Sequence, residues 1–556
     1  MNKLSNDLIQ FEMVYEYSST VYTQKEVEGK HIDISIDNKE NIYSAKLVSK
    51  VSEKIKLISF KMEFGYNFLE KSKVYLNGYQ SWTDSREYNI DEKLNCLSPL
   101  GKFASNLLSL NAYGDYGFKK YANVPGVFHG FSYAYIRNDK TYDLFGSLTE
   151  RQGFTIINFD CNSNLIIIEK DVEGVAFEKE YSILDLFYVS GEENAVFDMY
   201  FSAMNIQKPK EKHRCGYTTW YNYYPNINEK IVHDDLEALS STGEKIDIFQ
   251  IDDGYQTAVG DWLSIDNKKF PNGMKAVADS IHQKGMMAGI WLAPLGCQKG
   301  SKTLKEHPDW FIRDKNGKLV YSGINWGGFY TLDINNKAAA DYIRHCFDVI
   351  LNEWGYDLVK LDFLYGASMI PYNNKSRGQL MCEAMDFLRD CVGDKLILGC
   401  GVPLAPAFGK VDFCRIGPDM GLKWKRDFLM KHTHREFVCT EYAITNTIFR
   451  RQLDGRAFCN DPDVCLLRDY NIKMDFEQRR LVTKINKIFG NLIFISDNVD
   501  KYNEKQMEVF KETFRDTDIE RISAEYIDTD IVKVVYKENG EQKEITFNIG
   551  TGKEIK

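Results

Sequence analysis

The chain has 556 residues, enough for two to four domains, and 44% of them are hydrophobic, which suffices for a large core. Its formal net charge of −10 and the lack of a long basic run argue against nucleic acid or an anionic membrane as the main partner. No stretch approaches about eighteen consecutive apolar residues, so we expect no transmembrane helix.

Residues 1–26 lack the continuous apolar core of a secretion signal, which favours a cytoplasmic protein. The twelve cysteines lie mostly within apolar runs, as is typical of reduced core thiols rather than of a disulfide framework. No C-x-x-C pair and no H-E-x-x-H motif occurs, so neither a metal nor a cofactor is predicted. His432 and His434 form an H-x-H pair without further ligands at suitable spacing, which favours surface or helix-cap roles.

Residues 1–208 are predicted to form an antiparallel β-sandwich. Residues 32–36 and 54–60 alternate apolar and polar side chains, and residues 165–169 form a continuous apolar run, as in a strand buried on both faces. Turn residues separate such segments, and helical periodicity is scarce. A loop over residues 77–82 ends in Trp82, which either caps the sandwich edge or offers an aromatic surface to a neighbouring site.

Strand-like and helix-like segments alternate through residues 209–499, after a linker at Lys208-Pro209-Lys210. This alternation over nearly 300 residues predicts a parallel (β/α)8 barrel, or TIM barrel. Asn228 and Asn272 are candidate N-caps of two of its helices. The predicted strands are 215–220, 246–251, 286–292, 358–364, 396–400, 411–416 and 491–495, and the predicted helices are 228–240, 273–284, 337–353, 376–391 and 476–489.

Residues 500–556 return to strand-like segments. Residues 527–536 and 542–549 alternate apolar and polar side chains across Glu538-Asn539-Gly540, a hairpin turn signal. The complete prediction is a multidomain protein in which a TIM barrel carries an N-terminal antiparallel β-sandwich and a small C-terminal antiparallel β domain.

Carboxylates and other polar side chains stand at the ends of the predicted barrel strands, where the functional groups of such barrels lie. Lys360 and Asp362 are two positions apart in one strand and so project to the same face. Alone, this pair would more often be a structural ion pair. Four further strand ends carry comparable groups: Asp252 with Asp253, Trp291, the Gly399-Cys400-Gly401 turn, and Asp419.

This set contains several carboxylates but no metal ligands and no phosphate-binding glycine loop, which favours glycoside hydrolysis. That reaction needs one carboxylate as nucleophile or base and a second as general acid. Asp362 fits the nucleophile, because the positive charge of Lys360 would lower its pKa. Asp419 fits the acid/base, because the apolar turn before it predicts a desolvated carboxyl with a raised pKa.

The motifs RCGYTTWYNYY, IDDGYQ, GIWLAP, VKLDF, GCG and CRIGPD, in this order, resemble those of a glycoside hydrolase family 36 α-galactosidase, of clan D. The match spans essentially the whole barrel, and NGYQSW resembles the family's sandwich loop that reaches over the active site. The resemblance implies the same three-part fold. It also makes Asp362 the nucleophile and Asp419 the acid/base, with Asp252 and Asp253 binding the 4- and 6-hydroxyls of galactose.

The resemblance implies further contacts with the sugar. Lys360 would hydrogen-bond the sugar beside the nucleophile, and Arg415 would lie near the 2-position. The other implied pocket residues are Trp291, which could stack on the sugar ring, and Cys400, Trp220 and Trp82. The segment Asn460-Asp461-Pro462-Asp463 resembles a late family motif, but such a cluster is more typical of a turn or a buried brace.

The implied reaction is retaining exo-hydrolysis of terminal α-D-galactosyl residues from small α-galactosides of the melibiose and raffinose type. It would proceed through a covalent intermediate on Asp362, with the two carboxyl groups about 5 to 5.5 Å apart. An α-N-acetylgalactosaminidase, an α-galactosaminidase and a transglycosylase stay open as alternatives. A non-catalytic sugar-binding or sensor protein is a second alternative, disfavoured because both carboxylates are present. The expected partner is a small carbohydrate, and a homo-oligomer is left open.

Overall fold

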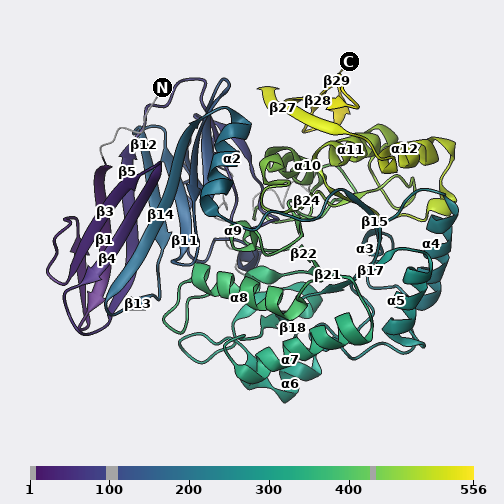
Figure 1. The fold of residues 1–556 in the computed structure, drawn as a ribbon, viewed down its shortest axis with the longest axis horizontal. Helices are drawn as coiled ribbons and strands as arrows, with labels where there is room; N and C mark the ends of the chain where they lie inside the picture. The colour runs from purple at the N-terminus through teal and green to yellow at the C-terminus, as the bar shows by residue number, and fades with distance from the viewer. Residues whose placement is uncertain (1–7, 95–109, 426–433, 556) are drawn as a thin grey trace.

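The computed structural model describes residues 8–94, 110–425 and 434–555 (Figure 1). An N-terminal β-sandwich lies on one side of a parallel barrel, and a small C-terminal sheet lies over one edge of the barrel. The predicted fold class is therefore confirmed. We propose 1–208, 209–499 and 500–556 as working domain limits, since helix α2 (Glu193–Met204) ends shortly before the first barrel strand, β15 (Arg214–Thr218).

The sandwich consists of two antiparallel seven-stranded sheets. The first contains β2 (Thr20–Gln24), β1 (Leu8–Tyr17), β5 (Ile55–Gly65), β12 (Leu165–Asp171), β11 (Phe154–Asp160) and β8 (Val127–Phe131), with β13 (Ala176–Phe177) paired to β5. The second runs β3 (Ile32–Lys39), β4 (Ile42–Ser49), β14 (Glu180–Gly191), β10 (Thr141–Ser147), β9 (Tyr133–Asn138), β6 (Lys73–Leu76) and β7 (Arg86–Asn89).

The second sheet is buried on both faces where it meets the rest of the protein. Because successive side chains of a strand point to opposite faces, Ala134 and Ile136 of β9 enter the sandwich core, whereas Tyr133 and Tyr135 join the core shared with α2 and the barrel. Figure 1 shows α2 between the sandwich and the barrel. This helix was missed by the prediction of a purely β N-terminal region. The prediction that residues 165–169 are buried on both faces is also wrong, since buried and half-buried side chains alternate along β12.

The barrel strands run parallel and are almost entirely buried, which is why their sequences are nearly continuous apolar runs. In sheet order after β15 they are β16 (Ile248–Ile251), β17 (Met287–Leu292), β21 (Leu358–Leu361), β22 (Leu396–Gly399), β23 (Phe413–Arg415) and β24 (Cys459–Asp461) on one side, and β26 (Leu492–Ile495) and β25 (Val464–Cys465) on the other.

Two consecutive short strands, neither of them predicted, lie at the two ends of this sheet. β24 pairs with β23 and β25 pairs with β26, and the chain passes from one to the other through Pro462 and Asp463. Asp463 has φ +82°, so the backbone turns sharply at this point. The Asn460–Asp463 segment thus ends β24 and forms the fully buried kink before β25.

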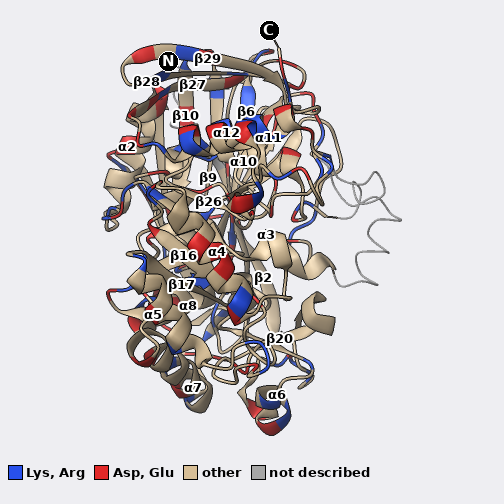
Figure 2. Cartoon of the chain, turned by 90° about the vertical axis from the view of Figure 1, so that its right-hand side faces the viewer, with Lys and Arg blue, Asp and Glu red and all other residues tan. Residues whose placement is uncertain are grey.

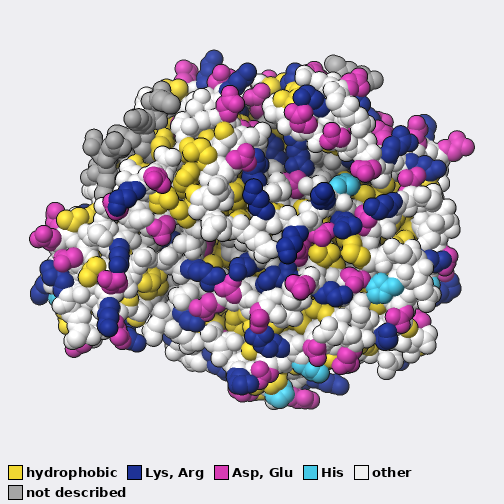
Figure 3. All heavy atoms as spheres, viewed as in Figure 1, with side chains coloured by type: hydrophobic (Ala, Val, Ile, Leu, Met, Phe, Trp, Pro, Cys, Tyr) yellow, Lys and Arg dark blue, Asp and Glu magenta, His cyan; other side chains and the backbone are white. Residues whose placement is uncertain are grey.

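Helices surround the barrel strands, and Figure 2 shows charged residues of both signs distributed over them. On the face in Figure 3, acidic and basic side chains are interspersed. The helices are α3 (Trp220–Tyr223), α4 (Glu229–Ser241), α5 (Gly273–Gln283), α6 (Lys302–Glu306), α7 (Lys337–Asp348, continued by a π-helical turn over Val349–Glu353), α8 (Arg377–Val392), α9 (Leu404–Ala407), α10 (Thr440–Phe449) and α11 (Phe476–Phe489).

Of the two predicted N-caps, one is confirmed. The Asn228 side chain accepts a hydrogen bond from the Ile231 amide, whereas Asn272 makes no such bond and donates instead to Glu229. No helix in the described part of the chain is long and apolar enough to cross a membrane.

The C-terminal region begins with helix α12 (Glu504–Phe514), which the prediction of an all-β module missed. The antiparallel sheet that follows contains β27 (Ile519–Asp528), β28 (Ile531–Glu538), β29 (Glu541–Asn548) and β30 (Lys553–Glu554). The hairpin turn at Asn539 and Gly540 is confirmed. The predicted strand 527–536 is wrong at its start, because residues 527 and 528 end the preceding strand.

Candidate active site

A cavity of about 480 Å³ opens at the carboxyl ends of the barrel strands. Because parallel strands end at the same rim, residues from distant parts of the sequence meet there. A larger cavity of about 1030 Å³ lies elsewhere, between the sandwich and the C-terminal sheet. Of the ten residues singled out in the sequence, eight line the first cavity: Trp82, Trp220, Asp252, Asp253, Trp291, Lys360, Asp362 and Asp419.

Asp362 directly follows β21 and is 8% exposed. Its Oδ2 accepts a hydrogen bond from Nε1 of Trp291 at 3.0 Å, and its Oδ1 accepts one from the Phe363 amide at 2.8 Å. Both oxygens are therefore held in place before a ligand arrives. Burial raises the pKa of Asp362, while the charge of Lys360 and the Trp291 hydrogen bond act in the opposite direction.

The ion pair of Lys360 is made with Asp252 rather than with Asp362. Its Nζ lies 2.9 Å from Oδ2 of Asp252, and both side chains are buried. Burial alone would lower the pKa of Lys360, but the charge of Asp252 raises it, so the ammonium group stays protonated. Asp252 also accepts hydrogen bonds from Gln250 and from the Asp253 amide. Lys360 therefore acts on Asp362 through space and ties two barrel strands together.

Asp253 is held by groups that sequence reasoning did not identify. Its Oδ2 accepts a hydrogen bond from Nε1 of Trp326 at 2.9 Å, and its Oδ1 accepts one from Gln256. Burial raises the pKa of Asp253, and the charge of Asp252 adds to this. Trp326 lies 5.9 Å from the Trp291 ring, measured between ring centroids, so two indoles and one carboxylate form one wall of the cavity.

Asp419 lies four residues beyond the end of β23, and its side chain is 35% exposed. Nη1 of Arg415 donates to its Oδ1 at 2.9 Å. The prediction of a desolvated Asp419 carboxyl is therefore wrong, because this group faces the open cavity and contacts a guanidinium. Arg415 itself is only 2% exposed and lies behind Asp419, outside the cavity lining.

The sandwich loop over residues 77–82 places Trp82 at the cavity, which is one of the two roles expected for this residue. Its indole Nε1 lies 3.4 Å from Sγ of Cys400, which places Cys400 behind Trp82 rather than on the cavity surface. The Trp82 ring also packs against Phe363, with the ring centroids 5.1 Å apart. A Cβ atom at Gly401 would lie 2.8 Å from the indole, and Gly401 has φ +55°, so this position requires glycine.

Arg450 fixes the loop that carries Trp82. Its guanidinium is fully buried and donates to Oδ1 of Asn77 and to the backbone carbonyls of Gln80, Ser81 and Ile416, at 2.5 to 3.1 Å. Three of these four acceptors belong to the loop and the fourth to the barrel. One side chain therefore joins the sandwich to the strand end that precedes Asp419.

Arg450→Met should destabilise the protein by about 3 to 5 kcal/mol, because it removes four hydrogen bonds to buried oxygens, of which only the Gln80 carbonyl keeps a second donor, the Thr83 amide. We expect the midpoint of urea unfolding, followed by tryptophan fluorescence, to fall clearly. Arg480→Met is the matched control, since Arg480 is partly exposed and pairs with Glu477 and Glu554 at the surface. Equal midpoints for the two variants would contradict the bracing role.

Several cavity residues lie on loops that carried no recognisable motif. Trp326 belongs to an excursion between β17 and α7 that forms a small sheet of β18 (Gly296–Gln298), β20 (Phe329–Thr331) and β19 (Tyr321–Gly323). The segment Asn325-Trp326-Gly327-Gly328 indicates a turn, because paired glycines are typical of backbone with positive φ, which both glycines adopt here. The other missed lining residues are Leu110, Tyr113, Ile324, Asn325, Phe363, Pro418, His434, Glu436, Phe437 and Val438.

The described residues contain no group of three or more His, Cys, Asp or Glu side chains that could hold a metal ion. Of the H-x-H pair, His434 lines the cavity, and His432 lies outside the described residues. Eleven of the twelve cysteines are described, and nine of these eleven are buried. Cys96 lies outside the described residues.

The melibiase family model matches residues 206–385, which include the cavity residues from Trp220 to Asp362. An α-galactosidase of Escherichia coli is 29% identical over 192 residues, covering 33% of this chain and 26% of the relative. An A type blood α-D-galactosamine galactosaminidase of Flavonifractor plautii is 30% identical over 142 residues, covering 23% of this chain and 12% of the relative. The matches thus span about a quarter of these relatives or less.

Among solved structures, TtGalA, an α-galactosidase from Thermus thermophilus in complex with p-nitrophenyl α-D-galactopyranoside, superposes with a TM-score of 0.72 at 23% identity. The match covers 96% of this chain and 98% of TtGalA, so the likeness of fold extends over all three parts of the molecule. Together with the family model, these matches confirm the resemblance to family 36 α-galactosidases.

Proposed function

We propose that this protein is a retaining exo-α-galactosidase that releases terminal α-D-galactosyl residues from small α-galactosides by double displacement. The observation that supports it best is the position of Asp362 and Asp419 on one cavity beside Asp252, Asp253 and tryptophan rings. Matches to α-galactosidases over the barrel and over the whole fold point the same way.

In the first step, the carboxylate of Asp362 attacks the anomeric carbon and forms a covalent galactosyl ester. Its hydrogen bonds from Trp291 and Phe363 hold it in one orientation, so little reorganisation precedes the attack. Asp419 gives its proton to the departing glycosidic oxygen. In the second step, Asp419 takes a proton from water, which attacks the ester and releases galactose with its original configuration.

Arg415 contributes positive charge next to Asp419. Its hydrogen bond to Oδ1 of Asp419 holds that carboxyl group in place beside the cavity. Lys360 holds Asp252 through an ion pair, and a carboxylate is a strong acceptor for a sugar hydroxyl. The pocket-lining role of Cys400 is proposed to be indirect, through its contact with Trp82.

A panel of matched nitrophenyl glycosides tests this proposal: the α-galactoside, the α-N-acetylgalactosaminide, the α-galactosaminide and the α-glucoside. We expect kcat/KM to be highest for the α-galactoside. Preference for an amino-sugar glycoside would favour the second candidate, an α-galactosaminidase, which the Flavonifractor relative supports by similarity. Binding of galactose without any turnover would favour a sugar sensor.

Asp253→Asn should reduce kcat/KM for nitrophenyl α-galactoside by about 10²-fold, because a site built around a hydroxyl depends on its partner group. If Asp253 binds the 6-hydroxyl, the variant should treat the 6-deoxy analogue, nitrophenyl α-D-fucoside, much as the wild type does. Steady-state kinetics on both substrates measures this. Equal losses on the two substrates would show that Asp253 has no role at the 6-position.

A further inference from the structure

One buried arginine holds three carboxylates beside the cavity. The guanidinium of Arg415 lies 2.9 Å from Oδ1 of Asp419, 3.1 Å from Oδ2 of Asp461 and 2.8 Å from Oδ1 of Asp463. Asp461 and Asp463 are fully buried, whereas the Asp419 side chain is 35% exposed. Only Asp419 of the three reaches the cavity lining.

Asp463 has a second connection to Asp419, through the backbone. Its Oδ2 accepts a hydrogen bond from the amide of Met420, the residue that follows Asp419, at 2.6 Å. The hydroxyl of Tyr221 donates to the same oxygen. The Asp463 amide in turn donates to Asp461, so the kink between β24 and β25 presents the carboxyl group to the turn that carries Asp419.

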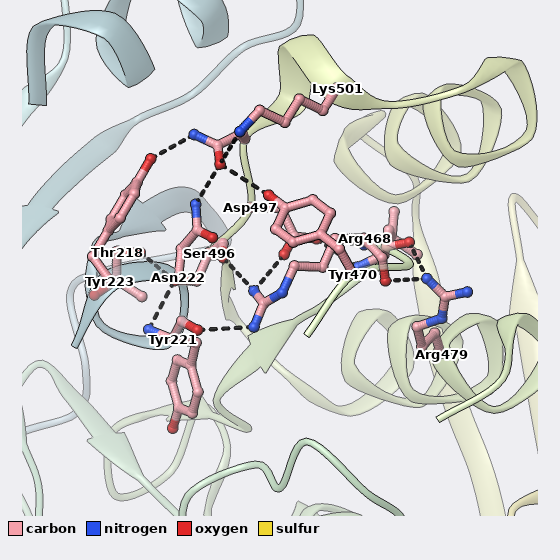
Figure 4. A network of polar contacts seen from close by, with 12 residues as sticks. Thr218, Tyr221, Asn222, Tyr223, Arg468, Tyr470, Arg479, Ser496, Asp497 and Lys501 are labelled. Atoms are coloured by element: carbon pink, nitrogen blue, oxygen red, sulfur yellow. Dashed lines mark hydrogen bonds and ion pairs between the residues drawn. The ribbon is translucent and has the colours of Figure 1, made fainter. Parts of the chain in front are cut away.

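Tyr221 is itself rigidly placed, as Figure 4 shows. Its amide donates to Ser496, and its carbonyl accepts a hydrogen bond from Nη2 of Arg468 at 2.8 Å. Arg468 pairs with the fully buried Asp497 at 2.7 Å. The hydroxyl that reaches Asp463 therefore comes from a residue whose backbone is fixed by hydrogen bonds.

The charges of this cluster do not balance. Three ionised carboxylates around one guanidinium would leave two negative charges in a largely buried space, which is costly. Burial raises the pKa of Asp463, and the charges of Asp419 and Asp461 raise it further against the effect of Arg415. A proton added to or removed from Asp463 thus changes the field at Asp419, because the two groups act on each other.

We propose that Asp463 is a positioning residue for the acid/base Asp419: it orients Arg415 and the Met420 amide, and its charge sets how tightly Asp419 holds its proton. This inference rests on the proposed function, in which Asp419 exchanges a proton with the substrate. Among the described residues, the charged and titratable groups that act on Asp419 include Arg415, Asp463, Asp362, Cys400, Tyr221 and Tyr224.

The test is Asp463→Asn, which keeps the shape of the side chain but cannot carry the negative charge of an ionised Asp463. Without that charge, Arg415 stabilises the Asp419 carboxylate more strongly and a like-charge repulsion is lost. Both effects lower the pH at which Asp419 gives up its proton. The basic limb of the kcat/KM profile should therefore move to lower pH by about one unit.

The change in kcat for substrates with different leaving groups provides a second test, because a purely structural role of Asp463 would affect them equally. Melibiose, whose leaving sugar needs a proton, should lose about tenfold in kcat. Dinitrophenyl α-galactoside, whose leaving group departs without one, should change by less than about threefold. Asp235→Asn is the matched control, because Asp235 is also buried and accepts hydrogen bonds from two tyrosine hydroxyls, away from the cavity. It should shift neither the profile nor this ratio.

Titration of the Asp419 carboxyl by ¹³C NMR, assigned with Asp419→Asn, separates the two hypotheses. If the titration of Asp419 moves to lower pH in Asp463→Asn, but the wild type turns over no α-galactoside, the positioning role is supported and the proposed function is contradicted. If the wild type turns over α-galactosides normally, but the titration of Asp419 is the same in Asp463→Asn as in the wild type, only the positioning role is overturned. If Asp463→Asn does not fold, Tyr221→Phe should give a smaller shift in the same direction, because losing its hydrogen bond favours neutral Asp463; no shift would again overturn the inference.

Discussion

Replacing Asp362 with alanine should lower kcat for α-galactosides by about 10⁴-fold or more while the protein stays folded. The variant has no atom that can attack the anomeric carbon, and the donors from Trp291 and Phe363 lose their acceptor. Added azide should restore turnover by occupying the vacated space and should yield the β-galactosyl azide, because it attacks from the side that Asp362 uses. Steady-state kinetics and NMR of the azide product measure both effects.

The control for this variant is Asp357→Ala. Asp357 precedes the same strand at the opposite end of the barrel, where it pairs with Lys395 and His282 near the surface. We expect kcat within about threefold of the wild type, since surface pairs contribute little. A wild-type rate for Asp362→Ala, or rescue to the α-azide, would contradict the assignment of the nucleophile.

Asp419→Ala should slow the hydrolysis of different substrates to different extents, depending on whether the leaving group must be protonated. Melibiose should lose about 10³-fold in kcat, because its leaving sugar must be protonated, whereas dinitrophenyl α-galactoside should form the covalent intermediate at nearly the normal rate. Hydrolysis of that intermediate should then be slow, so stopped-flow traces should show a burst of phenolate followed by slow turnover.

Azide should again accelerate turnover of Asp419→Ala, but the product should be the α-galactosyl azide. The azide replaces the water that Asp419 would activate, and it attacks the intermediate from the side opposite to Asp362. Opposite azide stereochemistry in the two variants would assign the two carboxylates independently. A uniform loss on all substrates, without a burst, would exclude Asp419 as the acid/base.

The functional side chains at the carboxyl ends of the barrel strands could be predicted from the sequence, because they follow apolar runs or turns that can be recognised locally. Apolar runs followed by Asp252, Asp362 or the turn before Asp419 place these side chains at one rim once the strands are parallel. Eight of the ten predicted site residues indeed line one cavity. The two others, Cys400 and Arg415, lie directly behind it, one residue away from the surface that the substrate would meet.

The ion-pair partners of these side chains on other barrel strands could not be predicted in the same way. Lys360 faces both Asp362 and the neighbouring strand, and only the register between β17 and its neighbours decides that Asp252 receives the ion pair. The exposure of Asp419 depends likewise on the width of the cavity. Such distances are set by packing over the whole barrel, which a single sequence does not display.

Loops and short helices account for the remaining errors. Trp326 and the 434–438 segment lie on loops without periodicity; the paired glycines after Trp326 indicate a turn, but no pattern places either loop over the cavity. Helix α12 did carry a signal, since Asn503 and Gln506 form a capping box. Strands β24 and β25 were hidden by Pro462, which normally argues against a central strand but here lies in the kink between the two.

Double displacement requires a covalent bond between galactose and Asp362, and trapping that bond is the most direct measurement. The wild-type protein is incubated with 5-fluoro-α-galactosyl fluoride, which slows hydrolysis of the intermediate, and the digested protein is analysed by mass spectrometry. We expect one fluorogalactosyl group, on the peptide containing Asp362, and none in Asp362→Ala. A label on any other residue, or no label while α-galactosides are hydrolysed with inversion, would contradict the double displacement at Asp362.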